Sequence, residues 1–515
     1  MKLTTSKDIK EAELTTINEY GISGLLLMEN AANGMLQIIN EKFSNLKGIQ
    51  IAIFCGSGNN GGDGYALARK LFLKGSNVSI FSTVKISTLK NEAKINAFSC
   101  QKLGINITEG KQNIEINKFE IIIDGLLGTG LRRTVIGITK QYIDFINKSN
   151  AFVVSIDVPS GLDCDKGIIR GCAVYSDLTI TFEKGKVGLY TQPGFKYSKQ
   201  IKVIPIDIPK AAFKSKKEQY FLFDYAMALN HIKKRNKIVS KGDFGNVVII
   251  AGGKGMIGAY AMCAKASMIS GVGYTNSLVP LSKIYEYNQL VSEVVCNGIN
   301  DDNKEYISYL RWEQIIETIS SLKKVGCIVI GPGIPKEAQS HEILKAIFDN
   351  FSIPVVIDAQ TLNDISKHIE ILKNKKGPVV ITPHPGEMAR LVKTSIENVQ
   401  ENRIEIAKTF ANKYDTIVLL KGHKSVVTDG NVVYINDSGN GGMATAGSGD
   451  VLAGIIGGKI TLGNDMLTDV AYSMYLHGVA GDLAKDKYGE NGLNATDIID
   501  NIKQAERKLY EEKTR

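Results

Sequence analysis

Residues 51–70, IAIFCGSGNNGGDGYALARK, join an apolar run to an amphipathic run through five glycines between Gly56 and Gly64. The apolar run is typical of a buried parallel strand. The amphipathic stretch 65–74 predicts a helix that Gly75 ends. A strand, a glycine-rich turn and a helix in this order predict a unit of an α/β fold, with the glycines free to adopt positive φ or to approach a ligand closely.

The segment 56–61 also spells G-x-G-x-x-G, the fingerprint of dinucleotide-binding folds. That fingerprint needs an acidic residue about 20 positions further on to hold the ribose. The second apolar run ends in IFSTVKIS, with no Asp or Glu before Glu92, and a P-loop is absent from the segment. An ordinary dinucleotide site is therefore disfavoured. Asn59, Asn60 and Asp63 instead place polar side chains in this loop, and the helix that follows offers free N–H groups that can bind an anion.

Short β-branched runs alternate with helical patterns twice along the chain, which predicts α/β architecture in two domains. The strand-like runs of the first half lie at 49–55, 77–84, 119–124, 151–157, 177–182 and 201–206, and those of the second half at 246–252, 327–331, 354–359, 378–383 and 416–422. The first half predicts a parallel sheet with helices on both faces. A stretch that is first lysine-rich and then aromatic, 210–225, predicts a connection, so we place the boundary near residue 220, between domains at 1–220 and 221–515.

The composition is that of a soluble globular enzyme, since 43% of the 515 residues are apolar and 22% are charged. The formal net charge is +9, but the lysines are scattered over 214–218, 233–237 and 373–376 without interleaved aromatics. Such clusters are typical of solvated loops and argue against a nucleic-acid partner.

The N-terminal residues 1–16 lack the apolar core of a signal peptide, and no run approaches the ~18 apolar residues of a membrane span. The seven cysteines include no C-x-x-C pair, which favours free buried thiols in a reducing compartment. We therefore expect a cytoplasmic protein that has no membrane partner.

Polar clusters follow the ends of several predicted strands, where ligands bind in open α/β sheets. Asp124 ends one strand and precedes a second glycine loop at 128–130, while Asp157 and Ser160 end the next strand. Asn60, Asp124 and Ser160 all offer hard oxygen donors and together could hold a hard cation. The alternative is that the two aspartates merely cap the helices that follow.

These motifs carry a family resemblance: MENAA (28–32), GSGNNGGDG (56–64), DGLLGTGL (124–131) and DVPSGLD (157–163) resemble the NAD(P)H-hydrate epimerase domain over residues 1–220. The resemblance implies a Rossmann-like domain in which Asn60, Asp124 and Ser160 bind K⁺ and Asp157 lies at the reacting ring as the candidate catalytic residue. It implies that the dinucleotide contacts Asn59, Asn60, Gly61, Gly62, Asp63, Gly128, Thr129, Gly130, Leu131, Arg132, Arg133, Thr134 and Asp157. Lys184 and Lys186 are further candidates for phosphate or acid–base roles. Ala32 departs from the glycine frequent in the family.

In the second half, NGGMATAGSGDVLAGIIGG (440–458) leads from a glycine-rich turn into Asp450 and an apolar helical run. The N–H groups of such a turn and of the helix N-terminus form an anion hole, and Asp450 can take a proton from a hydroxyl that attacks phosphorus. The alternative is a glycine turn with an ordinary acid in the first turn of a helix. His384, fixed between two prolines, and the segment 421–425 supply further polar groups at predicted strand ends.

This combination is similar to the ribokinase-like superfamily and, more closely, to ADP-dependent NAD(P)H-hydrate dehydratases, through KGDFGNVVIIAGG, GPG, TPHPGE, KGHKS and GMATAGSGDVLAG. The resemblance covers about 225–510 and implies Mg²⁺ and ADP. The adenine nucleotide would contact Lys421, Gly422, His423, Lys424, Ser425 and Gly449. The hydrated dinucleotide would contact Ala259, Gly333, His384 and Asp450. Gln360 stands where the family usually has an acid, which puts the magnesium or phosphate geometry there in doubt.

The two resemblances imply one bifunctional enzyme that acts on NADHX and NADPHX, the hydrated forms of NADH and NADPH. The first domain would interconvert the R and S epimers, and the second would dehydrate the S form with ADP, giving AMP and phosphate. The alternative is a ribokinase-like kinase of a vitamin or sugar whose first domain binds nucleotide without catalysis. Glycine-rich surfaces with small side chains point to a homo-oligomer.

Overall fold

The structure is a computed structural model that describes residues 1–110, 114–214, 219–233 and 238–514. It divides into two compact units, Lys2–Tyr220 and Phe221–Arg515, with Met1 belonging to the second. Most of the lysine-rich loops expected at 214–218 and 233–237 lies outside the described residues. Within these residues no helix is long and apolar enough to cross a membrane.

The first unit is built on a sheet with the order β3-β2-β1-β4-β5-β6-β7, and all of its neighbouring strands pair in parallel. Its strands are β1 (Gln50–Cys55), β2 (Asn77–Ser82), β3 (Asn106–Glu109), β4 (Ile121–Gly125), β5 (Phe152–Ile156), β6 (Leu178–Phe182) and β7 (Ile201–Ile204). The order reverses between β1 and β4, so the crevice where such sheets bind ligands lies at their carboxyl ends.

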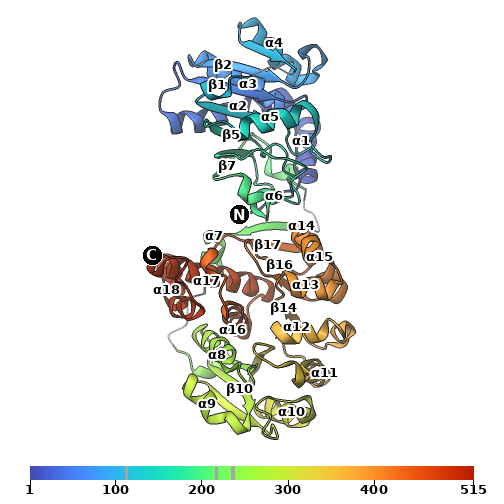
Figure 1. Cartoon of the computed structure of the whole chain (residues 1–515), viewed down its shortest axis with the longest axis vertical. Helices are drawn as coiled ribbons and strands as arrows, with labels where there is room; N and C mark the ends of the chain where they lie inside the picture. Colours follow the sequence, from blue (N-terminus) through green and yellow to red (C-terminus); the bar gives the residue numbers. More distant parts are fainter. Residues whose placement is uncertain (111–113, 215–218, 234–237, 515) are drawn as a thin grey trace. The chain divides into compact units, whose positions relative to one another are not determined.

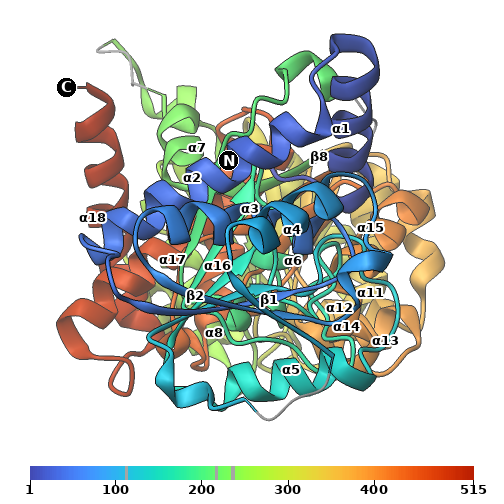
Figure 2. The ribbon, with the colours of Figure 1, turned by 90° about the horizontal axis from the view of Figure 1, so that it is seen from above.

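Helices cover both faces of this sheet, as the sequence predicts. They are α1 (Ser6–Tyr20), α2 (Gly24–Phe43), α3 (Asn59–Leu73), α4 (Asn91–Lys102), α5 (Gly137–Asn147) and the short α6 (Val187–Tyr190). Figure 2 shows α2, α3 and α4 along one face of the strands and α5 on the other. Alternate residues of β1 divide between the two cores: Ile51 and Ile53 pack towards α2 and α3, and Ala52 and Phe54 towards α5.

The helix predicted at 65–74 begins six residues earlier, because the glycine-rich segment 59–64 forms the first turns of α3. None of the glycines between Gly56 and Gly64 has positive φ. A Cβ on Gly61 would lie 2.0 Å from the carbonyl oxygen of Gly56, and one on Gly64 would lie 2.8 Å from Cys55 Sγ. These glycines therefore serve close packing of the helix on its strand, and the expectation of positive φ is wrong here.

The second unit contains a larger sheet with the order β11-β10-β9-β12-β13-β14-β15-β16-β17-β8. Pairing is parallel from β11 to β15 and antiparallel between β15, β16 and β17. The strands are β8 (Gln219–Phe223), β9 (Asn246–Ile250), β10 (Tyr274–Pro280), β11 (Val295–Ile299), β12 (Val325–Ile330), β13 (Val355–Ile357), β14 (Val379–Ile381), β15 (Ile417–Leu420), β16 (Val426–Thr428) and β17 (Val432–Asn436).

The helices of the second unit form two layers (Figure 1). On one face lie α8 (Ile257–Ile269), α16 (Ser448–Thr461), α17 (Met466–Tyr488) and α18 (Ala495–Thr514), whose apolar side chains pack with Val247 and Val329. On the other lie α10 (Trp312–Ser321), α11 (Ser340–Asn350), α12 (Ala359–Ile365), α13 (Pro385–Val392) and α15 (Arg403–Tyr414), which pack with Val248 and Ile330. The remaining helices are α7 (Tyr225–His231), α9 (Ile284–Leu290) and α14 (Ile396–Glu401).

Candidate active sites

The carboxyl ends of β1, β4 and β5 bring Asn60, Asp124 and Ser160 together in the first unit: Asn60 lies in the first turn of α3, Asp124 in β4 and Ser160 in the loop after β5. The Ser160 backbone N–H donates to Asp124 Oδ2 over 2.8 Å, and the Ser160 hydroxyl donates to Asp124 Oδ1. Asn60 Nδ2 donates to the Leu127 carbonyl oxygen over 3.1 Å, and the Ser160 hydroxyl lies 3.2 Å from the same oxygen. The three predicted metal ligands therefore surround one short segment of backbone.

Asp124 is a fully buried carboxylate at this point. Burial raises its pKa, and hydrogen bonds from Ser160, Ser155 and the Leu126 N–H oppose that rise. Among the described residues it forms no ion pair with Lys or Arg, and no group of three His, Cys, Asp or Glu side chains there could hold a metal. Its negative charge is thus stabilised by neutral donors alone, which leaves room for a cation bound by mixed oxygen donors.

Asp157 directly follows β5 and adopts a φ of +64°, a strained backbone conformation for a non-glycine residue. Its Oδ1 lies 2.5 Å from Lys186 Nζ and accepts a hydrogen bond from Thr181 Oγ1 over 2.9 Å. Lys186 is completely buried and also donates to Thr181 Oγ1 and to the Phe182 carbonyl oxygen, each over 2.9 Å. The pair is therefore held rigidly beside the crevice.

Two more carboxyl groups face this pair. Burial, the Asp157 charge and the Glu13 charge raise the pKa of Asp63 well above its usual range. Burial and the Asp157 charge raise the pKa of Glu13 to about 7, while Lys186 opposes the rise. The environment of Asp63 and Glu13 therefore favours the protonated form of both groups. Glu13 was not predicted from the sequence, because nothing in α1 marks it apart from its neighbours Glu11 and Glu19.

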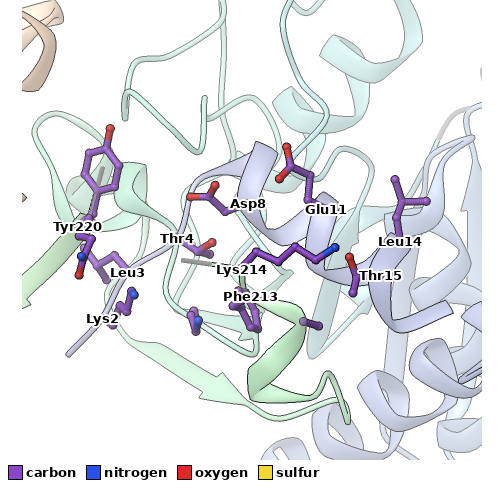
Figure 3. Close-up of a pocket in the computed structure, with 13 residues that line it drawn as sticks. Lys2, Leu3, Thr4, Asp8, Glu11, Leu14, Thr15, Phe213, Lys214 and Tyr220 are labelled. Atoms are coloured by element: carbon purple, nitrogen blue, oxygen red, sulfur yellow. The ribbon is translucent and has the colours of Figure 1, made fainter. Parts of the chain in front are cut away.

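Lys184 and Lys186, the two lysine candidates of the first unit, lie in different places. Lys186 reaches Asp157, whereas Lys184 lies over the Phe213 ring, with Nζ 3.2 Å from the ring centre. Lys184 lines a separate hollow of about 260 Å³ between the N-terminal segment, α1 and the Phe213 region (Figure 3). Of the two lysines, only Lys186 therefore lies at Asp157 as an acid–base candidate, whereas Lys184 lies at Phe213.

The predicted dinucleotide loop 128–134 connects β4 to α5. A Cβ on Gly128 would lie 3.2 Å from the Asn60 side chain, so this loop and the start of α3 are in contact. Arg132 is half exposed, forms an ion pair with Asp165 at 3.3 Å and contacts the Ser6 hydroxyl. The loop thus lies over the same crevice as Asn59–Asp63.

In the second unit, Asp450 lies in the first turn of α16, after a turn in which Gly447 has φ +88°. Burial raises the pKa of Asp450 to about 7, the nearby Asp358 charge adds to the rise, and Lys421 opposes it. A carboxyl with such a pKa is well matched to a general base near neutral pH.

Lys421 Nζ donates to Asp358 Oδ1 over 2.7 Å, and Thr382 Oγ1 donates to the same oxygen over 2.8 Å. A Cβ on Gly449 would lie 3.3 Å from Lys421 Nζ, so the ammonium group lies against the turn that leads into α16. Asp358 is 1% exposed and was not predicted as a site residue, although it lies two residues before Gln360. Gln360, the departure from the family pattern, donates to Asp364 on its own helix over 2.7 Å.

His384 caps the N-terminus of α13, and its Nδ1 accepts from the Gly386 N–H over 3.0 Å. Burial and the Lys421 charge lower its pKa. Glu387 completes the capping box by accepting from the His384 N–H over 2.8 Å, and burial raises its pKa to about 7. His384 is thus a fixed neutral side chain that is half exposed at the sheet edge.

The remaining predicted residues lie around this centre. The segment 421–425 turns back on itself, because Ser425 Oγ donates to the Gly422 carbonyl oxygen over 2.7 Å and Lys424 pairs with Asp437 over 2.8 Å. A Cβ on Gly333 would lie 2.9 Å from the Ala259 Cβ, so these two predicted contacts adjoin each other at the start of α8. His477 of α17 was not predicted: it lies 3.4 Å from Ser448 Oγ, and burial lowers its pKa to about 4.

Comparison with known proteins gives two family matches in one chain. The family described as NAD(P)H-hydrate dehydratase matches residues 247–504, and the family described as YjeF-related protein N-terminus matches residues 24–188. A bifunctional NAD(P)H-hydrate repair enzyme of Moorella thermoacetica is 32% identical over 99% of this chain and 98% of its own length. The Escherichia coli enzyme of the same name is 30% identical over 96% and 92%. Among solved structures, the ADP/ATP-dependent NAD(P)H-hydrate dehydratase of Bacillus subtilis is 25% identical, covering 56% of this chain and 98% of that one, with a TM-score of 0.49.

Proposed function

The chain belongs to the family of bifunctional NAD(P)H-hydrate repair enzymes, and we propose that it returns both epimers of hydrated NADH and NADPH to the reduced cofactors. The unit 1–220 epimerises the R and S forms, and the unit 221–515 dehydrates the S form at the expense of ADP. The observation that carries the proposal is the position of Asp450, a carboxyl with a pKa of about 7 at a helix N-terminus beside Lys421. A base beside an anion hole is what phosphoryl transfer to a hydroxyl requires.

In the dehydratase site, Asp450 accepts the proton of the C6 hydroxyl as its oxygen attacks the β-phosphorus of ADP. The turn before α16 offers backbone N–H groups to the transferred phosphoryl group. Phosphate is a far better leaving group than hydroxide, so its departure from C6 and loss of a C5 proton restore the dihydropyridine ring. We assign the dinucleotide to Ala259, Gly333 and His384 and the adenine nucleotide to 421–425 and Gly449.

In the epimerase site, Asp157 and Lys186 are the acid–base candidates, with the dinucleotide held by 59–63 and 128–134. The strained φ of Asp157 and its contact with buried Lys186 support this assignment, because strain is retained where function requires it. The charges of Asp63 and Glu13 interact with those of Asp157 and Lys186.

Two metal ions fit the residues present. A K⁺ held by Asn60, Asp124 and Ser160 would supply the positive charge that the buried Asp124 lacks among the described residues. A Mg²⁺ that accompanies nucleotide phosphates needs only one or two protein carboxylates. One candidate is Glu387, a buried carboxyl whose charge interacts with those of Lys421 and Asp358. When bound, the Mg²⁺ would neutralise phosphate charge. We also propose that the protein forms a homo-oligomer and that it is cytoplasmic.

The test is recovery of absorbance at 340 nm from a mixture of R and S hydrated NADH with ADP and Mg²⁺. Full recovery supports both activities. Recovery that stops at the S fraction leaves the dehydratase and removes the epimerase. No recovery with ADP or with ATP contradicts the proposal and returns the second unit to the small-molecule kinases. Asp450→Asn is the matched control that should give no recovery.

A further inference from the structure

Asp358, Thr382 and Lys421 are the first residues after three adjacent strands, β13, β14 and β15. Both hydrogen bonds of the group end on one oxygen, Asp358 Oδ1, which accepts from Lys421 Nζ over 2.7 Å and from Thr382 Oγ1 over 2.8 Å. Because the three residues are fixed to the ends of paired strands, the ammonium group has little freedom to move.

The ammonium group is directed away from the rest of the loop to which Lys421 belongs. An ideal Cβ on Gly449 would lie 3.3 Å from Lys421 Nζ and 3.9 Å from Asp358 Oδ2. Both groups therefore lie at the N-terminus of α16, beside Asp450. The residues after Lys421 form a turn, which the hydrogen bond from Ser425 Oγ to the Gly422 carbonyl oxygen closes, and Lys424 pairs with Asp437. Lys421 and Lys424 thus have different partners, Asp358 and Asp437.

A buried ion pair of this kind contributes little net stability, because removing both charges from water costs about as much as their attraction returns. Asp358 is 1% exposed and the Lys421 side chain 18% exposed, so both charges are largely removed from solvent. A fixed positive charge in a site that excludes water is, in contrast, effective at stabilising charge that develops during a reaction.

We propose that Lys421 is a catalytic residue that contacts the phosphoryl group in flight, and that Asp358 and Thr382 are positioning residues that hold its ammonium group at the N-terminus of α16. This role rests on the proposed dehydratase function and differs from binding of the nucleotide by the remainder of 421–425.

The C6 oxygen forms a bond to the β-phosphorus of ADP, and the bond from that phosphorus to the bridging oxygen breaks, so that AMP leaves with the electron pair. The hydroxyl proton goes to Asp450. Lys421 keeps its proton throughout and pairs with the non-bridging oxygens of the transferred group, over which charge is spread during transfer.

The experiment compares Lys421→Met with Lys424→Met in the full chain, measuring kcat, the KM for ADP and direct ADP binding. We expect Lys421→Met to lower kcat about 10²- to 10³-fold while ADP binds within a few-fold of wild type. Lys424→Met should instead raise the KM for ADP and weaken direct ADP binding. Asp358→Asn should lower kcat about tenfold or more, and combining it with Lys421→Met should add little further loss, because both act through one ammonium group.

Lys459→Met is the structural control, since Lys459 is also buried in α16 and pairs with Glu506 over 2.6 Å, away from Asp450. It should retain kcat at temperatures where the protein is folded. Should Lys421→Met fail to fold, Lys421→Arg replaces it: the larger group cannot occupy the same position, so kcat should fall while ADP still binds.

A rise in the KM for ADP at unchanged kcat in Lys421→Met overturns the inference and makes Lys421 a nucleotide-binding residue. An equal loss of kcat in Lys421→Met and Lys459→Met overturns it as well, because the effect is then structural. If the wild-type protein itself recovers no signal at 340 nm, the proposed function has failed, and that result is distinct from both of these.

Discussion

Asp450 must be unprotonated to accept a proton, and its surroundings oppose that form. Burial and the Asp358 charge raise the pKa of Asp450 to about 7, while the Lys421 charge opposes the rise. The Asp450 charge in turn contributes to the raised pKa of Cys263 in α8. We therefore expect kcat/KM of the dehydratase reaction to be level above pH 7 and to fall about tenfold for each unit below it. A rate that remains level down to pH 5 would contradict a base with this pKa.

Lys186 is buried and has a carboxylate partner, so its removal leaves Asp157 without its counter-charge. We expect Lys186→Met to lower the epimerase rate by at least 10²-fold and to leave dehydration of the S epimer unchanged. Lys184→Met is the matched control, because Lys184 lies over Phe213 rather than beside Asp157. The two rates are measured separately, by chromatography of the epimers and by absorbance at 340 nm. Equal losses in both variants would contradict the assignment.

At the scale of the element, the contact between α3 and β1 depends on glycine. A Cβ on Gly61 would lie 2.0 Å from the carbonyl oxygen of Gly56, and the Gly56 N–H is bonded to the Gly125 carbonyl oxygen at the end of β4, so this backbone has little room to shift. Gly61→Ala should therefore cost about 1–3 kcal/mol, a fall of roughly 5 °C in the melting temperature of the N-terminal unit by calorimetry. Gly58→Ala, where a Cβ meets nothing within 4 Å, should change it by less than about 2 °C. The reverse order would show that the segment is looser than described.

The strands that could be predicted are those with continuous apolar runs, such as β9 and β15, because burial on both faces requires them. Strand β10 carries buried Asn276 and Ser277, whose side chains bond Asn246 and Tyr260, so its sequence lacks that signal. Strand β8 lies in the stretch 210–225 that was predicted to be a connection. It is a short edge strand whose aromatic sequence directly follows lysine-rich residues, so the stretch does not stand out as a strand.

The candidate site residues likewise include some that the sequence could indicate and some that it could not. Asp124, Asp157 and Asp450 could be predicted because each follows a recognisable strand or glycine turn. Glu13 and Asp358 could not, because their partners lie far away in the sequence: Glu13 faces Asp157, and Asp358 pairs with Lys421. Choosing Lys186 over Lys184 likewise required the direction of each side chain, which depends on the local backbone.

At the scale of the whole molecule, the structure places one candidate site in each compact unit, and each is built from loops of its own sheet. Neither set of assigned residues borrows a side chain from the other unit. The two activities should therefore be separable by substitution: Lys186→Met should keep dehydration, and Asp450→Asn should keep epimerisation. An Asp450→Asn protein that loses epimerisation at full folded yield would show that the sites are coupled.

If the two activities are separable, a mixture of the two variants should restore the complete reaction. Lys186→Met alone should stop at the S fraction of a mixture of the R and S epimers of hydrated NADH, and Asp450→Asn alone should recover nothing. Together they should recover the whole signal at 340 nm, because the S epimer released by one protein can diffuse to the other. A mixture that still stops at the S fraction would mean that the epimer passes between units of one chain without release. Comparing the initial rate of the mixture with that of the wild type at equal site concentration then measures the advantage of joining both units in one polypeptide.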